Sequence, residues 1–397
     1  MTRFPALEHP QFRRYFIGQS IALIGGFAHN VAMAWLAFRL TGSVAVLGMV
    51  GFASLSPALI VSPFAGLLAD RYPRRQMLIG LLGFVGFLGI ALAALTALGW
   101  MNASVLIAVA FVRGLAFAFE IPIRHAFLVD LITDRAVLPN AVALHSTALN
   151  TARFIGPAIG GLMIGWVGEA ACFLLHPILL TATLIQLLRI QTVPQPPHKR
   201  GASFFGDFVE GWRYAFKDPV IARMLAGVFA LGFGVGPYVH LMPAAVAELY
   251  GAHPELVGLF ISSAGAGAMA AAITLAARRG SRYLSRIALA GNLSAVIGLA
   301  AFSRSSWMPL SVAGMVLVGL GVITQAVTTN MTIQKRVDDD KRGRVMAIYT
   351  SMFIGATPLG SLFFGQVGHW TGASGALLGG AVFGLAGALL TAWRMRA

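Results

Sequence analysis

The stretch Gly66-Leu67-Leu68-Ala69-Asp70-Arg71-Tyr72-Pro73-Arg74-Arg75 places a dense group of charges between two long apolar runs, 46–69 and 76–99. One aspartate and three arginines fall within six residues, in a chain that otherwise carries few charges. A short charged connector cannot lie in hydrocarbon, so it marks a membrane surface between two transmembrane segments. The fold is therefore expected to be built from membrane spans on either side of this connector.

The composition agrees with a protein dissolved in lipid. Of 397 residues, 57% are apolar and only 11% are charged, whereas globular proteins have about 25% charged residues. A polar shell cannot cover so apolar a chain, so a bilayer must act as its solvent. The single cysteine, Cys172, lies in an apolar run, which excludes a disulfide and a cysteine-rich metal site.

The net charge of +15 is distributed unevenly. On the topology given below, the basic clusters fall on one face of the membrane, and only Arg304 lies in a loop on the other. This asymmetry follows the positive-inside rule and predicts that both termini are cytoplasmic. It accounts for the basic charge without nucleic acid, which we do not expect as a partner. The clusters on the predicted cytoplasmic face are Arg13–Arg14, Arg71–Arg75, Lys199–Arg200, Arg278–Arg282, Lys335–Arg336, Lys341–Arg344 and Arg394–Arg396.

Apolar runs of about 20 or more residues, enough to cross about 30 Å of hydrocarbon, recur along the whole chain. The first has no small-residue cleavage site after it, so we expect it to be retained as a span and not removed as a signal peptide. The twelve predicted spans are 15–40, 46–69, 76–99, 103–127, 141–167, 170–190, 220–246, 255–277, 283–303, 307–331, 343–367 and 372–393.

Between the sixth and seventh spans the composition changes. Residues 191–201 are rich in Pro, His and Lys, as in a linker. Aromatic residues then repeat every four positions, at Phe204, Phe208, Trp212 and Phe216, which predicts an amphipathic helix on the inner leaflet. The predicted organisation is a six-helix bundle over 1–191, a cytoplasmic linker with that helix over 192–219, and a second six-helix bundle over 220–397.

The two sets of six spans resemble each other. Residues 160–168 (GGLMIGWVG) align with residues 360–368 (GSLFFGQVG), where Gly, Leu, Gly, Val and Gly recur in register. Spans 5 and 11 are therefore predicted to be equivalent positions in two related bundles. The opening motif has a reduced counterpart in residues 276–282, which lacks the aspartate.

The pattern Gly-x-Leu-Ala-Asp-Arg-x-x-Arg-Arg resembles the signature loop between helices 2 and 3 of the major facilitator superfamily of transporters, with Pro73 where that family usually has Gly. The resemblance covers nearly the whole chain. It implies an all-α membrane protein with twelve transmembrane helices in two pseudo-symmetric bundles that rock about a site near the membrane midplane.

In that family the loop acts as a conformational latch that holds the cytoplasmic side closed. By the resemblance, Asp70 sits near the start of span 11, where a helix N-terminus favours an anion, and Arg74 reaches Glu120 on span 4. The alternative is that the arginines only set the topology. The implied latch residues are Gly66, Asp70, Arg71, Arg74, Arg75 and Glu120.

Span 5 carries Gly156-Pro157-Ala158-Ile159-Gly160-Gly161, which resembles the core of the antiporter motif in exporters of the superfamily. The upstream glycines of that motif are Ala143 and Ala152 here. Pro removes a helix hydrogen bond and Gly permits close approach, so this stretch can bend and pack tightly. Ordinary small-residue helix packing is the alternative interpretation, but the motif favours export over import.

Several polar residues lie deep in the predicted spans, where they are costly unless they face a cavity or a partner. They are candidates for substrate contact or a proton network, and helix packing is the alternative for each. Arg113 resembles the span-4 arginine of the family's second motif, without its usual spacing to Gly, and for Arg153 we favour a structural role. The set is His29, Asn30, Arg113, Arg153, Tyr238, His240, Gln325 and Asn330.

The sequence does not identify which residue carries the proton. Many drug antiporters of the superfamily have an acid in span 1, and this chain has none there. Glu120 is the only carboxylate clearly inside a span, and the latch would occupy it. His29 or His240 can titrate near neutral pH.

The sequence contains no pattern for ATP binding or for a metal centre. No Gly-x-x-x-x-Gly-Lys occurs, so ATP is not expected as an energy source, and no His-x-x-x-His or Glu-x-x-His pair indicates a metal centre. We expect no cofactor, no catalytic residues and no enzymatic activity.

Local strings favour the branch of the superfamily that contains the enterobactin exporter and the macrolide efflux pumps. They include Phe12-Arg13-Arg14-Tyr15, Phe119-Glu120-x-Pro122-x-Arg124 and Arg342-Gly343-Arg344-Val345. The resemblance implies a monomeric secondary exporter of a small amphiphilic molecule (a siderophore, drug or macrolide-like compound) in a bacterial inner membrane, driven by the proton gradient. An importer or lipid flippase of the same fold is the alternative, and a membrane receptor or enzyme is the alternative of another class.

Overall fold

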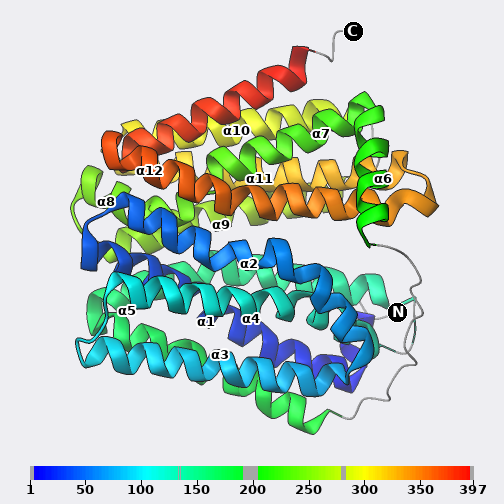
Figure 1. Cartoon of the computed structure of the whole chain (residues 1–397), viewed down its shortest axis with the longest axis horizontal. Coiled ribbons are helices and arrows are strands. Elements are labelled where there is room, and N and C mark those ends of the chain that lie inside the picture. Colours follow the sequence, from blue (N-terminus) through cyan, green and yellow to red (C-terminus); the bar gives the residue numbers. More distant parts are fainter. Residues whose placement is uncertain (1–3, 133, 135, 191–203, 279–282, 394–397) are drawn as a thin grey trace. The chain divides into compact units, whose positions relative to one another are not determined.

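The structure is a computed structural model, drawn in Figure 1. It describes residues 4–132, 134, 136–190, 204–278 and 283–393, without the side chains of residues 60, 62–67, 69–71, 204–209, 339–340, 390–391 and 393. Every regular element of this described part is a helix. The all-α prediction is therefore confirmed.

The described helices supply the twelve predicted spans. Nine segments are long and apolar enough to cross a membrane, and the apolar part of α2 adds a shorter one, Val44–Leu59. Two of the nine, α5 and α12, are 52 and 55 residues long and are bent in the middle, so each provides two spans. The helices are α1 (Pro10–Thr41), α2 (Val44–Arg71), α3 (Arg74–Ala97), α4 (Ala103–Asp130), α5 (Leu138–Arg189), α6 (Phe204–Lys217), α7 (Pro219–Ala230), α8 (Tyr238–Tyr250), α9 (Pro254–Ala277), α10 (Leu284–Arg304), α11 (Met308–Arg336) and α12 (Asp339–Trp393), with short turns η1 (Pro5–Glu8) and η2 (Leu231–Val235).

The seventh span, predicted over 220–246, contains an irregular segment in the structure. It consists of α7, the π-helix η2 and α8, with a break at Gly236–Pro237. Proline has no N–H for a helix hydrogen bond, and a Cβ at Gly234 would meet the carbonyl oxygen of Gly380 on α12. The irregular turn therefore lies where a proline follows a close helix contact, and single-turn π segments of this kind often accompany functional sites.

The chain forms two compact units. Unit 1 comprises Met1–Thr41, Ala53–Lys199 and His253–Ser262, and unit 2 comprises Gly42–Phe52, Arg200–Ala252 and Ser263–Ala397. The start of α9 thus belongs to unit 1 and the start of α2 to unit 2. The predicted boundaries near 191 and 219 stay predictions, and residues 191–203 of the predicted linker lie outside the described part.

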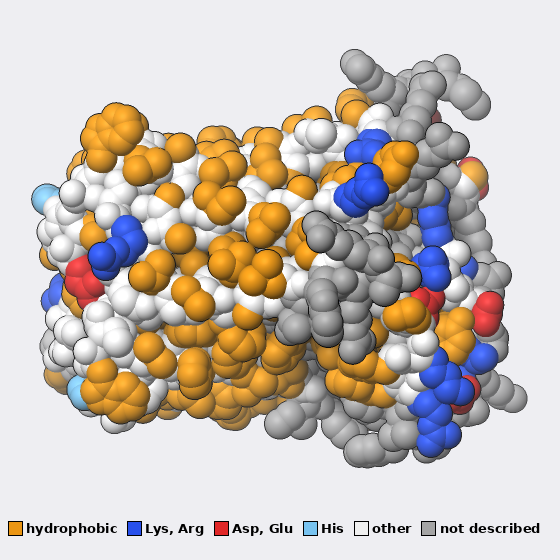
Figure 2. Space-filling view, turned by 90° about the horizontal axis from the view of Figure 1, so that it is seen from above, with side chains coloured by type: hydrophobic (Ala, Val, Ile, Leu, Met, Phe, Trp, Pro, Cys, Tyr) orange, Lys and Arg blue, Asp and Glu red, His pale blue; other side chains and the backbone are white. Residues whose placement is uncertain are grey.

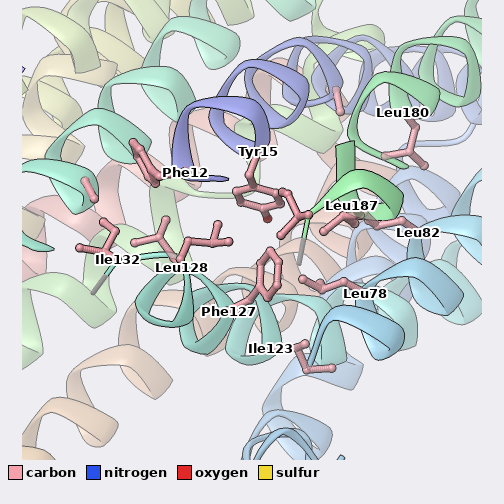
Figure 3. Packing of buried hydrophobic residues seen from close by; sticks show 14 of the residues in the cluster. Phe12, Tyr15, Leu78, Leu82, Ile123, Phe127, Leu128, Ile132, Leu180 and Leu187 are labelled. Carbon is pink, nitrogen blue, oxygen red and sulfur yellow. The ribbon is translucent and has the colours of Figure 1, made fainter. Parts of the chain in front are cut away.

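Unit 1 has an apolar core at the end that carries the charged α2–α3 turn. Figure 3 shows side chains from α1, α3, α4 and α5 converging there. The Tyr15 and Phe127 rings meet edge to face with centroids 5.2 Å apart. Leu78 and Leu187 are further members of this cluster. Because four helices contribute, this core fixes the rotation of α3 and α4, which carry the charged side chains described below.

Spans 5 and 11 are equivalent, but their register differs from the one that the sequence suggests. The break in α5 is at Gly168 and the break in α12 is at Gly372, not at Gly368. In unit 1 a Cβ at Gly161 would lie 2.9 Å from the Cα of Gly258, and in unit 2 a Cβ at Gly365 would lie 2.6 Å from the Cα of Gly48. The structural alignment is therefore shifted by four residues, about one helical turn.

The surface matches a membrane protein. Figure 2 shows hydrophobic side chains over the middle of the visible face, with Lys and Arg near the ends of the helices. Trp100 and Trp307 are exposed close to helix ends, and Trp166 and Trp370 are exposed beside the breaks in α5 and α12. Amphipathic rings at such positions suit the membrane–water interface. The exposed apolar surface is therefore suited to contact with lipid and not with water.

Candidate functional site

The turn between α2 and α3 is held by two arginines in unit 1. Arg74 donates from Nη1 to Asp130 Oδ1 at the end of α4, at 2.7 Å, and both side chains are largely buried. Arg75 donates to the carbonyl oxygens of Leu187 and Leu188, at 2.6 and 2.8 Å. These carbonyls lie in the last turn of α5, where a helix leaves acceptors unpaired and where its dipole favours a cation. The turn therefore ties α2–α3 to both α4 and α5.

The contact of Arg74 with Glu120 that the resemblance implies stays a prediction. Glu120 forms an ion pair with Arg124, one turn further along α4, and Arg74 pairs with Asp130. Glu120 and Asp130 are separated by ten residues, about 15 Å of helix. Arg74 is the first residue of α3 and lies at the level of Asp130. The side chains of Gly66, Asp70 and Arg71 lie outside the described residues, so their part in a latch stays a prediction.

The glycines of the antiporter-like motif are contact points of α5 in unit 1. A Cβ at Gly156 would lie 2.6 Å from the Cβ of Phe27, and one at Gly160 would lie 2.9 Å from the Cα of Ala28, both on α1. Gly161 makes the equivalent contact with α9 on another side of the helix. Pro157, buried between these positions, brings its carbonyl oxygen against Gly258. The motif thus places the backbone of α5 against two neighbouring helices at once.

Arg113 and Asn30 meet at mid-span between α4 and α1. Arg113 Nη1 donates to Asn30 Oδ1 at 3.0 Å, with Arg113 half-buried and Asn30 exposed. Among the described residues no carboxylate pairs with Arg113, since Glu120 is bound to Arg124. A cation at the centre of a helix span costs about 2.5–3.5 kcal/mol on insertion scales, so an amide oxygen alone is a weak partner for it.

His29 lies on the neighbouring, buried side of α1, against α5. It is 1% exposed, and neither ring nitrogen has a hydrogen-bond partner in the described structure. Its ring packs edge-on against Phe173, with centroids 5.0 Å apart, and lies 5.7 Å from the ring of His176. Two imidazoles therefore meet inside the membrane-spanning part of unit 1, next to the Arg113–Asn30 pair.

Of the other candidates, Arg153 is half-buried on α5 in unit 1, and two lie on α8 in unit 2. Tyr238 is the first residue of α8, directly after the helix break. His240 Nδ1 lies 3.4 Å from Ser361 Oγ on α12 and also borders Gly51 of α2. These contacts show helix packing at His240, and its proposed role in transport stays a prediction.

Gln325 belongs to a buried polar group between α7, α10 and α11. Its Nε2 donates to the Met224 carbonyl at 3.4 Å and to Thr329 Oγ1 at 3.3 Å, and it borders a small pocket that also includes Ser285. Asn292 lies within this group, and neither polar atom of its amide has a hydrogen-bond partner in the part of the chain that the structure describes. Asn330 points elsewhere and accepts a hydrogen bond from Gln334 at 2.5 Å. The candidates on α11 are therefore not brought together.

Several polar residues were missed by sequence reasoning. Asp130 and His176 are not among the candidates that the sequence predicts. Arg124 and Asn292 were also absent from the candidates. The signal that identifies His176 is general: any ionisable residue inside an apolar span is a candidate functional residue. In the described residues no group of His, Cys, Asp or Glu fits a metal ion.

The helix arrangement, with twelve spans, repeat-related breaks and an arginine-anchored turn, defines the class: a multi-pass membrane protein of the major facilitator fold. The solved structure of the nucleoside transporter NupG matches with a TM-score of 0.75 at 12% identity, covering 98% of this chain and 99% of that chain. A bacterial homologue of the lysosomal transporter Spinster matches with a TM-score of 0.74 at 12% identity, covering 98% and 97%.

The family described as transmembrane secretion effector matches residues 1–396, and the chain belongs to that family. Its relatives include the staphyloferrin A transporter of Staphylococcus aureus (28% identity; 88% of this chain and 87% of the relative). The macrolide efflux protein A of Streptococcus pyogenes is 22% identical over 93% of both chains. The multidrug efflux pump Tap of Mycobacterium bovis is 26% identical over 87% of this chain and 84% of the relative. The sequence resemblance to the major facilitator superfamily is confirmed.

Proposed function

We propose that this protein is a secondary active exporter that moves a small amphiphilic molecule across a bacterial inner membrane by alternating access, in exchange for protons. The observation that carries the proposal is the match of nearly the whole chain to a secretion family whose relatives include a macrolide efflux protein and a multidrug efflux pump. Both termini are cytoplasmic in this proposal, in keeping with the basic clusters, and transport needs neither ATP nor a bound cofactor.

The packing of spans 5 and 11 supports alternating access. Each of these spans touches a neighbouring helix backbone to backbone, through Gly161 on Gly258 in unit 1 and through Gly365 on Gly48 in unit 2. Such contacts let helices slide or tilt without breaking interlocked side chains. Matched contacts in two repeats give the protein two equivalent positions about which its helices can move.

Inside-out vesicles test direction and coupling together. Vesicles containing the protein are energised with lactate and supplied with erythromycin, ethidium or carboxyfluorescein, compounds of different charge. We expect accumulation of at least one compound above vesicles without the protein, abolished by nigericin, which collapses the pH gradient. Accumulation only in right-side-out vesicles would identify an importer. Accumulation that persists with nigericin and valinomycin together, which remove both the pH gradient and the membrane potential, would exclude proton exchange as the energy source.

A further inference from the structure

Among the described residues, no carboxylate pairs with the charge of Arg113. Arg113 lies ten residues into the 28-residue helix α4, about 15 Å from the helix start and close to the middle of the span. Its guanidinium has five N–H donors, and in the described structure its hydrogen-bond partner is one neutral oxygen, that of Asn30. Asn30 is exposed and Arg113 is half-buried on unit 1, so a molecule arriving at this face can reach the pair.

Among the described residues, the carboxylate that acts electrostatically on Arg113 is that of Glu120, and it is already paired. Glu120 lies seven residues further along α4 and is bound by Arg124. His29 and His176 lie within electrostatic reach of Arg113. His29 is almost fully buried, and neither of its ring nitrogens has a hydrogen-bond partner among the described residues. A cationic or neutral ligand gains nothing from this environment, whereas an anion supplies the missing charge and hydrogen-bond acceptors.

We propose that Arg113 and Asn30, adjoining the His29–His176 pair, bind an anionic group, a carboxylate, of the transported molecule. The inference rests on the proposed export function and narrows its cargo to acidic amphiphiles. A carboxylate matches the planar fork of a guanidinium with two parallel hydrogen bonds. The amide of Asn30, already oriented by Arg113, can donate a further hydrogen bond to the same group. A lipid head group is not the source we infer, because the site is at mid-span.

A pair of compounds that differ only in charge tests this site without a gradient. Full-length protein in phosphatidylcholine nanodiscs, which contain no anionic lipid, is titrated by calorimetry with 4-phenylbutyrate and with 4-phenylbutylamine. We expect the carboxylate to bind at least about tenfold more tightly, the effect of one charge-assisted hydrogen bond. Equal affinity, or preference for the amine, would overturn the proposal. This equilibrium measurement is independent of transport, so failure of the vesicle assay is separately recognisable.

Two variants assign the preference to the site. Arg113→Gln removes the charge and should abolish the preference for the carboxylate. Asn30→Asp keeps Arg113 but supplies an internal carboxylate in its place, and should abolish the preference even if Arg113→Gln does not fold. The control Arg304→Gln, at the exposed end of α10, should bind as the wild type does. Wild-type affinity for 4-phenylbutyrate in a folded Arg113→Gln or Asn30→Asp protein would contradict the assignment.

Discussion

Gly168 and Gly372 break two repeat-related helices with the same backbone conformation, φ 83° and ψ 171° in α5 and φ 77° and ψ 169° in α12. This region of backbone space is accessible essentially only to glycine. The next span in each unit begins at once, so a single residue makes each turn. In unit 2 the turn is also capped, because Glu248 accepts hydrogen bonds from the amides of Ala373 and Ser374, the latter at 2.8 Å.

Alanine at either break should destabilise the protein. At Gly168 there is open space around a Cβ, so Gly168→Ala should cost only the backbone strain, about 1–3 kcal/mol. Gly372→Ala should cost more, because a Cβ would also lie 2.8 Å from Glu248 Oε1. Reversible unfolding in mixed micelles measures both. Gly80→Ala is the matched control, since Gly80 is helical and has no neighbour within 4 Å of a Cβ; it should not destabilise.

Arg74 and Asp130 should be energetically coupled. Their side chains are 18% and 10% exposed at 2.7 Å, so the pair is worth more than a surface ion pair of about 0–1 kcal/mol. A double-mutant cycle with Arg74→Gln and Asp130→Asn should give a coupling of about 1–2 kcal/mol in unfolding free energy. The same cycle between Arg74 and Glu120 should give about zero. A larger coupling of Arg74 with Glu120 than with Asp130 would favour Glu120, the partner that the sequence resemblance implies.

The predicted latch can be tested at Asp70 whatever its partner. Asp70→Asn removes a charge that a closed cytoplasmic side is expected to need, so it should shift the population towards the inward-open state and reduce transport. Double electron–electron resonance between labels on the cytoplasmic face measures that population. Unchanged distance distributions in Asp70→Asn would limit the role of the acidic turn to topology.

The sequence predicts the spans well because apolar length is a property of each segment alone. The breaks at residues 168 and 372 show where such reasoning ends. Glycine-rich helices allow two alignments one turn apart, and both match glycine with glycine; only the contacts with Gly258 and Gly48 select one of them. Sequence identity counted over a short window therefore chose the wrong register.

Side-chain partners were harder to predict than spans, because they depend on helix rotation. Arg74 has two acids on α4 within a plausible distance in sequence, and the core around Tyr15 and Phe127 determines which one it meets. The neighbours His29 and His176 are 147 positions apart, and no local pattern connects them. Arg113 was identified from its depth in the membrane, but its contact with Asn30 required the structure.

The pH dependence of stability should include a contribution from Asp218. Burial raises the pKa of this carboxyl, but the hydrogen bond from Arg336, the Val220 amide and the charge of Arg336 outweigh it, so the net pKa is lowered below the ordinary value of 3.8. A lowered pKa in the folded state stabilises the protein above pH 3.8 and the effect is lost as the pH falls through the folded-state pKa. Asp218 also caps α7, at 2.7 Å from the Val220 amide.

Asp218→Asn separates the charge from the cap. Asparagine is as good an N-cap as aspartate, so this variant should lose only the ion pair with Arg336, which is half exposed and worth about 1 kcal/mol or less. Its deficit relative to wild type should be present at pH 7 and disappear below about pH 3.8. Melting temperatures across this range measure it, and a deficit that grows on acidification would have the wrong sign for a lowered pKa.

The equivalence of the two glycine contacts makes a final prediction. Gly161→Ala and Gly365→Ala each place a methyl group within 3 Å of the backbone of a neighbouring helix, and overpacking of this kind costs about 1–3 kcal/mol. The two variants should therefore destabilise to a similar degree and should both slow transport, since each forces a contact between helices apart. Gly83→Ala, with no neighbour within 4 Å, should leave both properties unchanged. If only Gly161→Ala affected transport while both variants lost stability, the contact in α5 would have a role that its repeat partner in α12 does not share.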